Sequence, residues 1–404
     1  MHSDNKSVRV LYSFGSKLDG QRIGYTAWQQ INGLAAAGAD ILACPSVLRV
    51  PVPENVTVMP TLSWGKLRIS YKLVGRLRSY AMHDWLVARR LQKLAGKIDI
   101  VHTWPLGALE TLKVARRMGI ATVLERPNAH TRFAYEVVQK ECDRIGVPLP
   151  SGHEHAYNRA VLEREEVEYE LADRLLCPSD FVVQTFLERG FSPDKLARHS
   201  YGFDEKRFYP DATRNPSRGL TVLFAGVCAV RKGLHFALEA WLKSPAHHDG
   251  VFLIAGGFIP GYAEKLAHMI GHPSVRVLGH RSDIPELMRQ SDVLVLPTIE
   301  EGSALVTAEA RGSGCVLVVS DAAGANCRHL ENALVHQAGD VETLTQHLTL
   351  LHEDRAFLER LRAASLGSVH EITWTAAGVQ LHEVYREVIA AKRAQRSILS
   401  ETSL

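Results

Sequence analysis

The chain has 404 residues, of which 46% are hydrophobic and 23% charged, and its 47 basic and 44 acidic side chains give a formal net charge of +3. This composition is typical of globular proteins and excludes disordered and fibrous chains, and so small a net charge does not indicate nucleic-acid binding. The length predicts two domains, because a single core seldom grows beyond about 250–300 residues.

The first residues pass from a polar stretch directly into a short apolar run, and the sequence has no long uninterrupted apolar window. We therefore expect neither export nor a membrane-spanning segment, and a cytoplasmic location. The six cysteines lie far apart and form no Cys-x-x-Cys pair. Such spacing favours reduced core thiols over a zinc site or a disulfide framework.

The first half of the chain alternates short apolar runs with helix-like segments. Short β-branched runs separated by amphipathic helices are typical of parallel sheets covered on both faces. The predicted strands are Val8–Phe14, Asp40–Cys44, Asp99–Thr103 and Ala121–Leu124, and the predicted helices include Tyr25–Ala37 and Leu106–Met118.

A basic segment, Trp64–Lys97, interrupts this alternation. It carries nine Lys and Arg residues against one acid, Asp84, so its charge is +8 and the rest of the chain carries −5. Apolar and aromatic residues lie between the cations, which is typical of a helix that binds an anionic membrane surface. The same cations could attract an acidic or lipid-diphosphate acceptor, or the segment could be a solvated helix face whose apolar side packs on the first domain.

The second half repeats the alternation after a polar linker at Tyr209–Gly219. Its predicted strands are Leu220–Ala225, Val251–Ala255, Val275–Leu278, Asp292–Pro297 and Cys315–Ser320, followed by helical segments at Val341–Ala364 and Trp374–Ala391. The whole pattern predicts an α/β protein with two doubly wound, Rossmann-like domains that face each other across a cleft. Ligands of such domains bind at the carboxyl ends of the strands.

Two glutamates follow the strand that ends at Pro297. Glu301 lies in the loop after it, and Glu309 lies within a helix predicted from Ala304 through Arg311. Both carboxylates could face the crevice and accept hydrogen bonds from a vicinal diol, while free amides at the helix start favour a phosphate; these amides are expected around Ser303, Ala304 and Leu305. The combination suits a nucleoside-diphosphate sugar. The alternative from the residues alone is that Glu301 caps the helix and Glu309 is solvated.

Several motifs in fixed order resemble the retaining glycosyltransferases of family 4, part of the group 1 glycosyl transferases. In the last third of the chain the matching residues are Pro297-Thr298, Glu301-Gly302-Ser303-Ala304, Glu309-Ala310 and Gly312-Ser313-Gly314-Cys315-Val316. Further upstream they are Ala172-Asp173, Pro178-Ser179, Tyr201-Gly202-Phe203-Asp204, Phe208-Tyr209-Pro210, Phe224-Ala225-Gly226, Arg231-Lys232-Gly233 and Leu253-Ile254-Ala255-Gly256-Gly257.

This resemblance implies a GT-B fold with an acceptor-side domain at 1–210, a donor domain at 211–373 and a C-terminal helical segment at 374–404 that crosses back to the first domain. By position, Glu309 would bind the ribose hydroxyls and Glu301 would face the transferred sugar, close to Gly302. Lys232 would hold the leaving diphosphate, next to the strand-end glycine Gly226.

Two departures from the family pattern affect this donor site. Val227 stands where the family commonly has Arg, so Arg231 is the candidate for the missing guanidinium. Ser303-Ala304 replaces the usual Phe-Gly.

In the first domain, the resemblance implies that Gly24 lies in a flexible loop over the donor phosphates and that His130 contacts sugar or acceptor. The residue-level alternatives are a simple turn glycine and a polar surface histidine. The sequence contains no Asp-x-Asp, so we expect transfer without a metal and without another cofactor.

The expected function is transfer of a hexose from a nucleoside-diphosphate sugar to the hydroxyl of a glycan or lipid-linked acceptor, in glycan, polysaccharide or glycolipid biosynthesis. No nucleic-acid partner is expected, and the basic segment is the candidate for peripheral contact with an anionic membrane surface. The alternatives are another GT-B enzyme such as a nucleotide-sugar epimerase, or an inactive scaffold subunit that binds nucleotide sugars. A Ser-His-Asp hydrolase and a dinucleotide-binding enzyme are excluded because the chain lacks G-x-S-x-G and G-x-G-x-x-G motifs at the required places.

Overall fold

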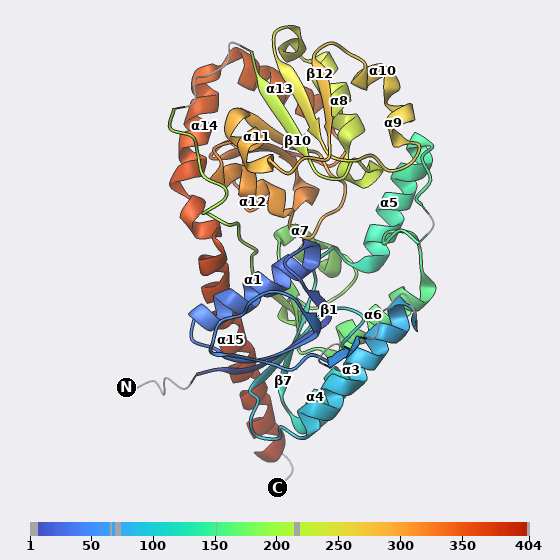
Figure 1. The fold of residues 1–404 in the computed structure, drawn as a ribbon, viewed down its shortest axis with the longest axis vertical. Helices are drawn as coiled ribbons and strands as arrows, with labels where there is room; N and C mark the ends of the chain where they lie inside the picture. Colours follow the sequence, from blue (N-terminus) through green and yellow to red (C-terminus); the bar gives the residue numbers. More distant parts are fainter. Residues whose placement is uncertain (1–6, 65–66, 69–73, 151, 214–218, 402–404) are drawn as a thin grey trace.

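The computed structural model describes residues 7–64, 67–68, 74–150, 152–213 and 219–401. Within these residues the chain forms a seven-stranded and a six-stranded parallel sheet with helices around them (Figure 1). The strands of the first sheet lie between Arg9 and Arg198, and those of the second lie between Thr221 and His336. The predicted α/β architecture with two doubly wound domains is confirmed.

The first sheet has the strand order β3-β2-β1-β6-β7-β8-β9. Its strands are β1 (Arg9–Leu18), β2 (Asp40–Leu48), β3 (Val56–Val58), β6 (Ile100–Thr103), β7 (Ala121–Glu125), β8 (Arg174–Cys177) and β9 (Leu196–Arg198), and a separate antiparallel pair is formed by β4 (Ser63–Trp64) and β5 (Leu67–Arg68). The helices of this part are α1 (Arg22–Ala36), α3 (Arg76–Gln92), α4 (Leu109–Met118), α5 (Thr131–Ile145), α6 (Arg159–Leu171) and α7 (Asp180–Leu187).

The second sheet has the order β12-β11-β10-β13-β14-β15. Its strands are β10 (Thr221–Ala225), β11 (Val251–Ala255), β12 (Val275–Gly279), β13 (Val293–Leu296), β14 (Val316–Ser320) and β15 (Ala333–His336). The helices are α8 (Leu234–Lys243), α9 (Tyr262–Lys265), α10 (Ala267–Ile270), α11 (Ile284–Gln290), α12 (Leu305–Gly312), α13 (Val341–Glu353) and α14 (Arg355–Gly367).

The strand order of the second sheet places its ligand site. Strand β10 is flanked by β11 on one side and β13 on the other, so the chain order reverses at β10. The crevice beyond the carboxyl ends of the strands at such a reversal is where doubly wound sheets bind ligands. The two loops that leave this point, after β10 and after β13, contain the predicted donor residues.

Helix α15 (Trp374–Glu401) leaves the second domain and packs on the first, beside α1 (Figure 1). The two helices approach closely because glycines face each other: a Cβ atom at Gly33 would lie 2.9 Å from the Cα of Gly378. Leu381 and Tyr385 of α15 are buried in the core beneath β1 and α1. This helix therefore fastens the end of the chain to the first domain.

The basic segment forms helix α3, although residues 65–66 and 69–73, which include Lys66 and Lys72, lie outside the described residues. Val87, Ala88 and Leu91 turn their side chains into the first domain. Asp84, the only acid of the segment, is fully buried and accepts hydrogen bonds from the first turn of α4, at Thr111 N–H (2.9 Å). The packed apolar side agrees with the interpretation as a solvated helix face.

The outward side of α3 carries Arg78, Met82, Trp85 and Arg89 at helical spacing, and Met82 and Trp85 are 38% and 51% exposed. The guanidinium of Arg89 stacks over the Trp85 ring at 4.8 Å. Among the helices of the described ranges, none combines the length and the apolar character needed to cross a membrane.

Candidate functional site

The loop after β10 is held in place by two glycines. Gly226 follows the last residue of β10 with a φ of 143°, and Gly233 has a φ of 71°. A Cβ atom at Gly233 would lie 1.9 Å from the carbonyl oxygen of Pro297, so only glycine permits this approach. The contact presses the short turn Val230–Lys232 against the loop that follows β13.

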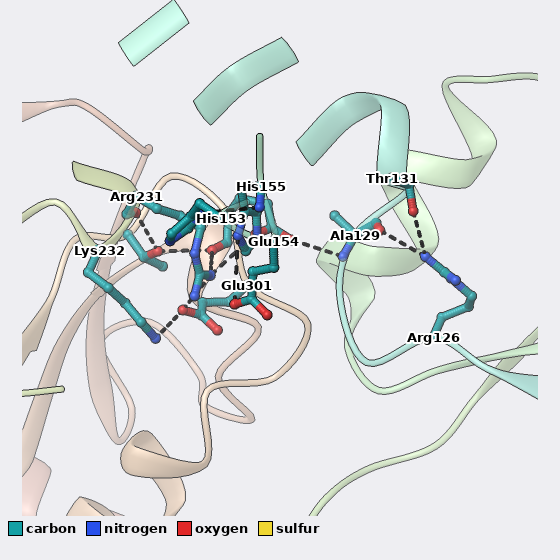
Figure 2. Close-up of polar contacts among 11 residues, drawn as sticks. Arg126, Ala129, Thr131, His153, Glu154, His155, Arg231, Lys232 and Glu301 are labelled. Carbon is teal, nitrogen blue, oxygen red and sulfur yellow. Dashed lines mark hydrogen bonds and ion pairs between the residues drawn. The ribbon is translucent and has the colours of Figure 1, made fainter. Parts of the chain in front are cut away.

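Arg231 and Lys232 converge on one carboxylate oxygen (Figure 2). The Nη1 atom of Arg231 lies 2.7 Å from Oε1 of Glu301, and the Nζ atom of Lys232 forms an ion pair with the same oxygen. The three side chains are only 14%, 16% and 10% exposed, respectively. Burial lowers the pKa of Lys232, and the charge of Glu301 opposes that change. The structure thus brings together three residues predicted from the sequence.

Arg231 is a second cation, beside Lys232, at the Glu301 carboxylate. Val227, which replaces the arginine common in the family, is 58% exposed. The guanidinium of Arg231, four residues later, reaches the carboxylate that Lys232 also binds. The paired cations beside Glu301 therefore come from adjacent residues of one turn.

Glu300, next to Glu301, is fully buried and joins the two domains. Its Oε1 accepts a hydrogen bond from the Ala129 N–H (3.1 Å), and its Oε2 lies 3.1 Å from His155 Nε2 and 3.2 Å from Arg231 Nη1. Burial alone would raise the pKa of Glu300, but its bonds with His155, Arg231 and Ala129 lower the pKa to about 2. The carboxylate is therefore ionised at neutral pH.

At Gly302 the backbone of the second domain lies directly against the backbone of the first domain. A Cβ atom there would lie 1.7 Å from the carbonyl oxygen of Pro127, and the Gly302 carbonyl accepts a 2.5 Å hydrogen bond from the Ser179 hydroxyl. Glycine is required because the backbones of the two domains touch at this point. The residues after β13 are thus enclosed by the loop after β7 and the start of α7.

Helix α12 begins at Leu305, one residue after the predicted start. The Ala304 N–H donates to the Ala323 carbonyl (3.2 Å), so this amide is not free for a phosphate as predicted. None of the hydrogen bonds among the described residues uses the N–H groups of Ser303 and Leu305. Two of the three predicted amides therefore remain available.

Glu309 lies in the second turn of α12 and accepts no hydrogen bond from the described residues. Burial raises its pKa to about 7, Arg207 lowers it and Asp204 raises it further. A carboxylate that is desolvated without a partner costs stability, and such groups cluster at functional sites. The side chain is partly exposed, so the alternative of a solvated Glu309 stays open.

The side chain of His130 is buried in the first domain. Its side chain is 3% exposed and packs among the rings of Tyr169, Phe186 and Phe191, with centroid distances between 4.9 and 5.9 Å. Its Nδ1 accepts a hydrogen bond from the Arg132 N–H (3.2 Å) at the start of α5. Burial and neighbouring arginines lower its pKa to about 3, so the ring is neutral. His130 caps helix α5, and its contact with sugar or acceptor stays a prediction.

Gly24 lies in the first turn of α1 and not in a loop, since β1 extends to Leu18 and the helix begins at Arg22. A Cβ atom at Gly24 would lie 2.6 Å from the Lys17 carbonyl oxygen. The loop prediction is therefore wrong because the strand is longer than its apolar run indicates. The following residue, Tyr25, packs against the same apolar cluster, of Tyr201, Trp374 and Ala377, as Leu305 at the start of α12.

The comparisons with known proteins agree with this geometry. Residues 219–354 match the family model of the glycosyl transferases group 1. The chain carries a group 1 glycosyl transferase domain. Among curated relatives, the N,N'-diacetylbacillosaminyl-diphospho-undecaprenol alpha-1,3-N-acetylgalactosaminyltransferase of Campylobacter jejuni is 28% identical over 40% of this chain and 45% of its own. The chain thus spans about half the length of the first curated relatives it matches.

Solved structures show the fold. Sucrose-phosphate synthase from Thermosynechococcus elongatus superposes on 96% of this chain and 100% of its own length, with a TM-score of 0.68 at 17% sequence identity. HepE of Anabaena, in complex with UDP, matches 95% of this chain and 100% of its own with a TM-score of 0.63 at 15% identity. The expected two-domain GT-B fold is confirmed.

The sequence analysis did not identify every residue that builds this site. Nothing in the sequence pattern singles out Glu300, His155 or Ala129. Ser179 belongs to a motif that the resemblance contains, but its contact with Gly302 carries no sequence signal. Among the described residues, no group of three or more His, Cys, Asp and Glu side chains is arranged to hold a metal ion.

Proposed function

We propose that this chain is a retaining glycosyltransferase that moves a hexose from a nucleoside-diphosphate sugar to an acceptor hydroxyl. The observation that carries the proposal is the convergence of Arg231 and Lys232 on Glu301 at the carboxyl edge of the second sheet. In this assignment residues 1–210 hold the acceptor, residues 211–373 hold the donor, and the segment 374–404 returns to the first domain.

The two cations suit the departing group. In the transfer, the bond between the anomeric carbon and the diphosphate oxygen breaks, and a bond to the acceptor oxygen forms on the same face of the sugar while the acceptor hydroxyl loses its proton. Negative charge develops on the diphosphate as it leaves, and fixed cations in a water-poor site stabilise that charge. Lys232 and Arg231 are such cations, and with the absence of Asp-x-Asp from the sequence they support transfer without a metal.

The buried carboxylate suits the nucleoside. An ionised Glu309 can accept two hydrogen bonds from the ribose hydroxyls, which would replace the solvent that burial removes. Structures of the same fold bind UDP, as HepE of Anabaena does, and this likeness supports a nucleoside diphosphate as the ligand. The position of Arg231 beside Lys232 favours an active enzyme over an inactive scaffold subunit.

The outward face of α3 supports contact with an anionic membrane surface. Arg78, Met82, Trp85 and Arg89 place two exposed apolar side chains between two cations on one side of the helix. Such a face can insert its apolar groups at the lipid boundary while the cations bind headgroups, at about 1 kcal/mol per cation. The name of the Campylobacter jejuni relative includes a diphospho-undecaprenol, which favours a lipid-linked acceptor for this chain as well.

The donor assignment is tested by ligand binding and then by turnover. Nucleoside diphosphates and nucleotide sugars are screened by thermal shift. The donor should raise the melting temperature of the protein, because a ligand that binds only the folded state stabilises it. With the donor found, Lys232→Ala and Glu309→Ala should each lower transfer at least about tenfold, while Lys243→Ala, a change at a 59% exposed lysine, serves as the control. Normal turnover by both site variants would refute the assignment, and NMR of the product would separate transfer from epimerisation.

The membrane proposal has a separate test. Wild-type protein should sediment with vesicles rich in anionic lipid at low salt, and Trp85→Ala together with Arg89→Ala should release it. If the wild type ignores these vesicles, the membrane proposal is refuted and the donor assignment is unaffected.

A further inference from the structure

Glu300 receives its hydrogen bonds from both domains. The first domain supplies two partners of the Glu300 carboxylate. They are the backbone N–H of Ala129, just before α5, and the ring of His155, in the segment between α5 and α6. The second domain supplies the third, Arg231, whose Nη1 also bonds to the Glu300 carbonyl oxygen at 2.5 Å. Figure 2 shows Ala129 on the side of this cluster opposite to Lys232, and His155 over its centre.

Because the Glu300 carboxylate is buried, it needs these hydrogen-bond partners to remain stable in the folded protein. Its side chain is 0% exposed, and a buried carboxylate is tolerated only when it is paired and hydrogen-bonded. Separation of the domains would remove both partners from the first domain and leave Arg231 as the only one. The position of Glu300 therefore depends on the junction with the first domain.

Glu300 acts on the site through Arg231. The guanidinium is held from one side by the carbonyl and carboxylate oxygens of Glu300 and from the other by Glu301. Glu301 is also the partner of Lys232. Without the Glu300 carboxylate, Arg231 would keep the carbonyl oxygen of residue 300 and Glu301 as partners, and its guanidinium would lose one of the three oxygens that fix it beside the Lys232 ammonium.

We propose that Glu300 is a positioning residue that fixes Arg231 beside Lys232 for the donor diphosphate, and that the first domain completes this arrangement through His155 and Ala129. The inference rests on the proposed function, since it assigns the diphosphate to this pair of cations. It adds that the donor site includes a contribution from the first domain that does not touch the donor. Arg231 and Lys232 are the groups that bind the ligand, and Glu300 and His155 set their position.

The test measures nucleotide affinity of the full chain by calorimetric titration with UDP, GDP and ADP. For the nucleotide that the wild type binds, Glu300→Gln and His155→Ala should each weaken binding at least about tenfold, because each removes a hydrogen bond to a charged group. If Glu300→Gln does not fold, His155→Ala decides alone, since His155 lies in a segment between helices and perturbs the same carboxylate.

A matched control comes from a second contact between the domains. Glu141 of α5 lies 2.8 Å from His235 of α8, so this pair also joins the two domains but touches neither Arg231 nor Glu301. Glu141→Gln should leave the nucleotide affinity within about twofold of wild type. In an Arg231→Met background, Glu300→Gln should have little further effect on affinity, because two residues that act as one unit are not additive.

Each remaining outcome bears on one proposal. Equal losses of affinity in Glu300→Gln and Glu141→Gln, or a full effect of Glu300→Gln without Arg231, would overturn the positioning role and leave the proposed function standing. A wild type that binds none of the three nucleotides would refute the proposed function, and the inference would fall with it.

Discussion

Replacement of Glu309 by Gln removes a carboxylate whose pKa is raised by burial from 4.5 to about 7. Between these two values the folded protein binds more protons at this position than the unfolded chain does. The stability of the wild type therefore falls as the pH rises through this range. The gap between the two pKa values corresponds to about 3 kcal/mol, which is lost in full above pH 7.

Gln has the same shape but does not titrate, so Glu309→Gln should lack this loss. The free energy of unfolding of the variant minus that of the wild type should be about 2.5 kcal/mol larger at pH 8 than at pH 5. Urea unfolding of both proteins at the two pH values measures this difference, and other titrating groups cancel because both proteins contain them. Nucleotide binding should be lost in the same variant, since stabilising changes at a functional site often cost function.

The control is Glu387→Gln, at an exposed position of α15, which should show the same difference from wild type at both pH values. If Glu309→Gln also differs from wild type by the same amount at pH 5 and pH 8, the reasoning from burial is refuted. A variant that is stabilised at pH 8 and still binds nucleotide normally would keep the pKa argument and refute the assignment of Glu309 to the ribose.

Two further predictions concern the packing of the first domain. Gly33→Ala should lower the free energy of unfolding by about 1–3 kcal/mol, because the new Cβ would lie 2.9 Å from the Cα of Gly378 in α15. The matched control is Gly367→Ala, where a new Cβ meets no atom within 4 Å. Equal melting temperatures of the two variants would contradict the close contact between α1 and α15. His130→Ala should lower the melting temperature but leave turnover per folded molecule within about threefold of wild type, because the ring caps α5 and packs among aromatic side chains. A loss of turnover at unchanged stability would instead indicate that His130 contacts the substrate.

The sequence by itself determined the fold and three residues that meet at the candidate site, Arg231, Lys232 and Glu301. Buried parallel strands read as continuous apolar runs, so β10, β13 and β14 were predicted within a residue or two. The order of the family motifs then selected Lys232, Glu301 and Glu309, and the structure places the first two in direct contact. Local signals sufficed because each of these residues lies at the end of a strand or in the first turns of the following helix.

Short or partly polar elements escaped the sequence analysis. Strands β8 and β9 contain Arg174 and Arg198, whose charges interrupt the apolar pattern that marks a buried strand. The position of His130 at a strand end indicated the crevice, whereas its ring packs among aromatic side chains of the first domain. Strand-end position specifies where a backbone lies and not where its side chain points.

Only the tertiary structure decided which residues share the donor site across the junction. Glu300 meets Ala129 and His155 over separations of 171 and 145 residues, and no local pattern encodes a contact at that distance. The required glycine at position 302 has the same origin, since the carbonyl that excludes a side chain there belongs to Pro127 of the other domain. Propensity and periodicity act over a few residues, whereas these contacts exist because two independently predicted domains pack against each other in one geometry.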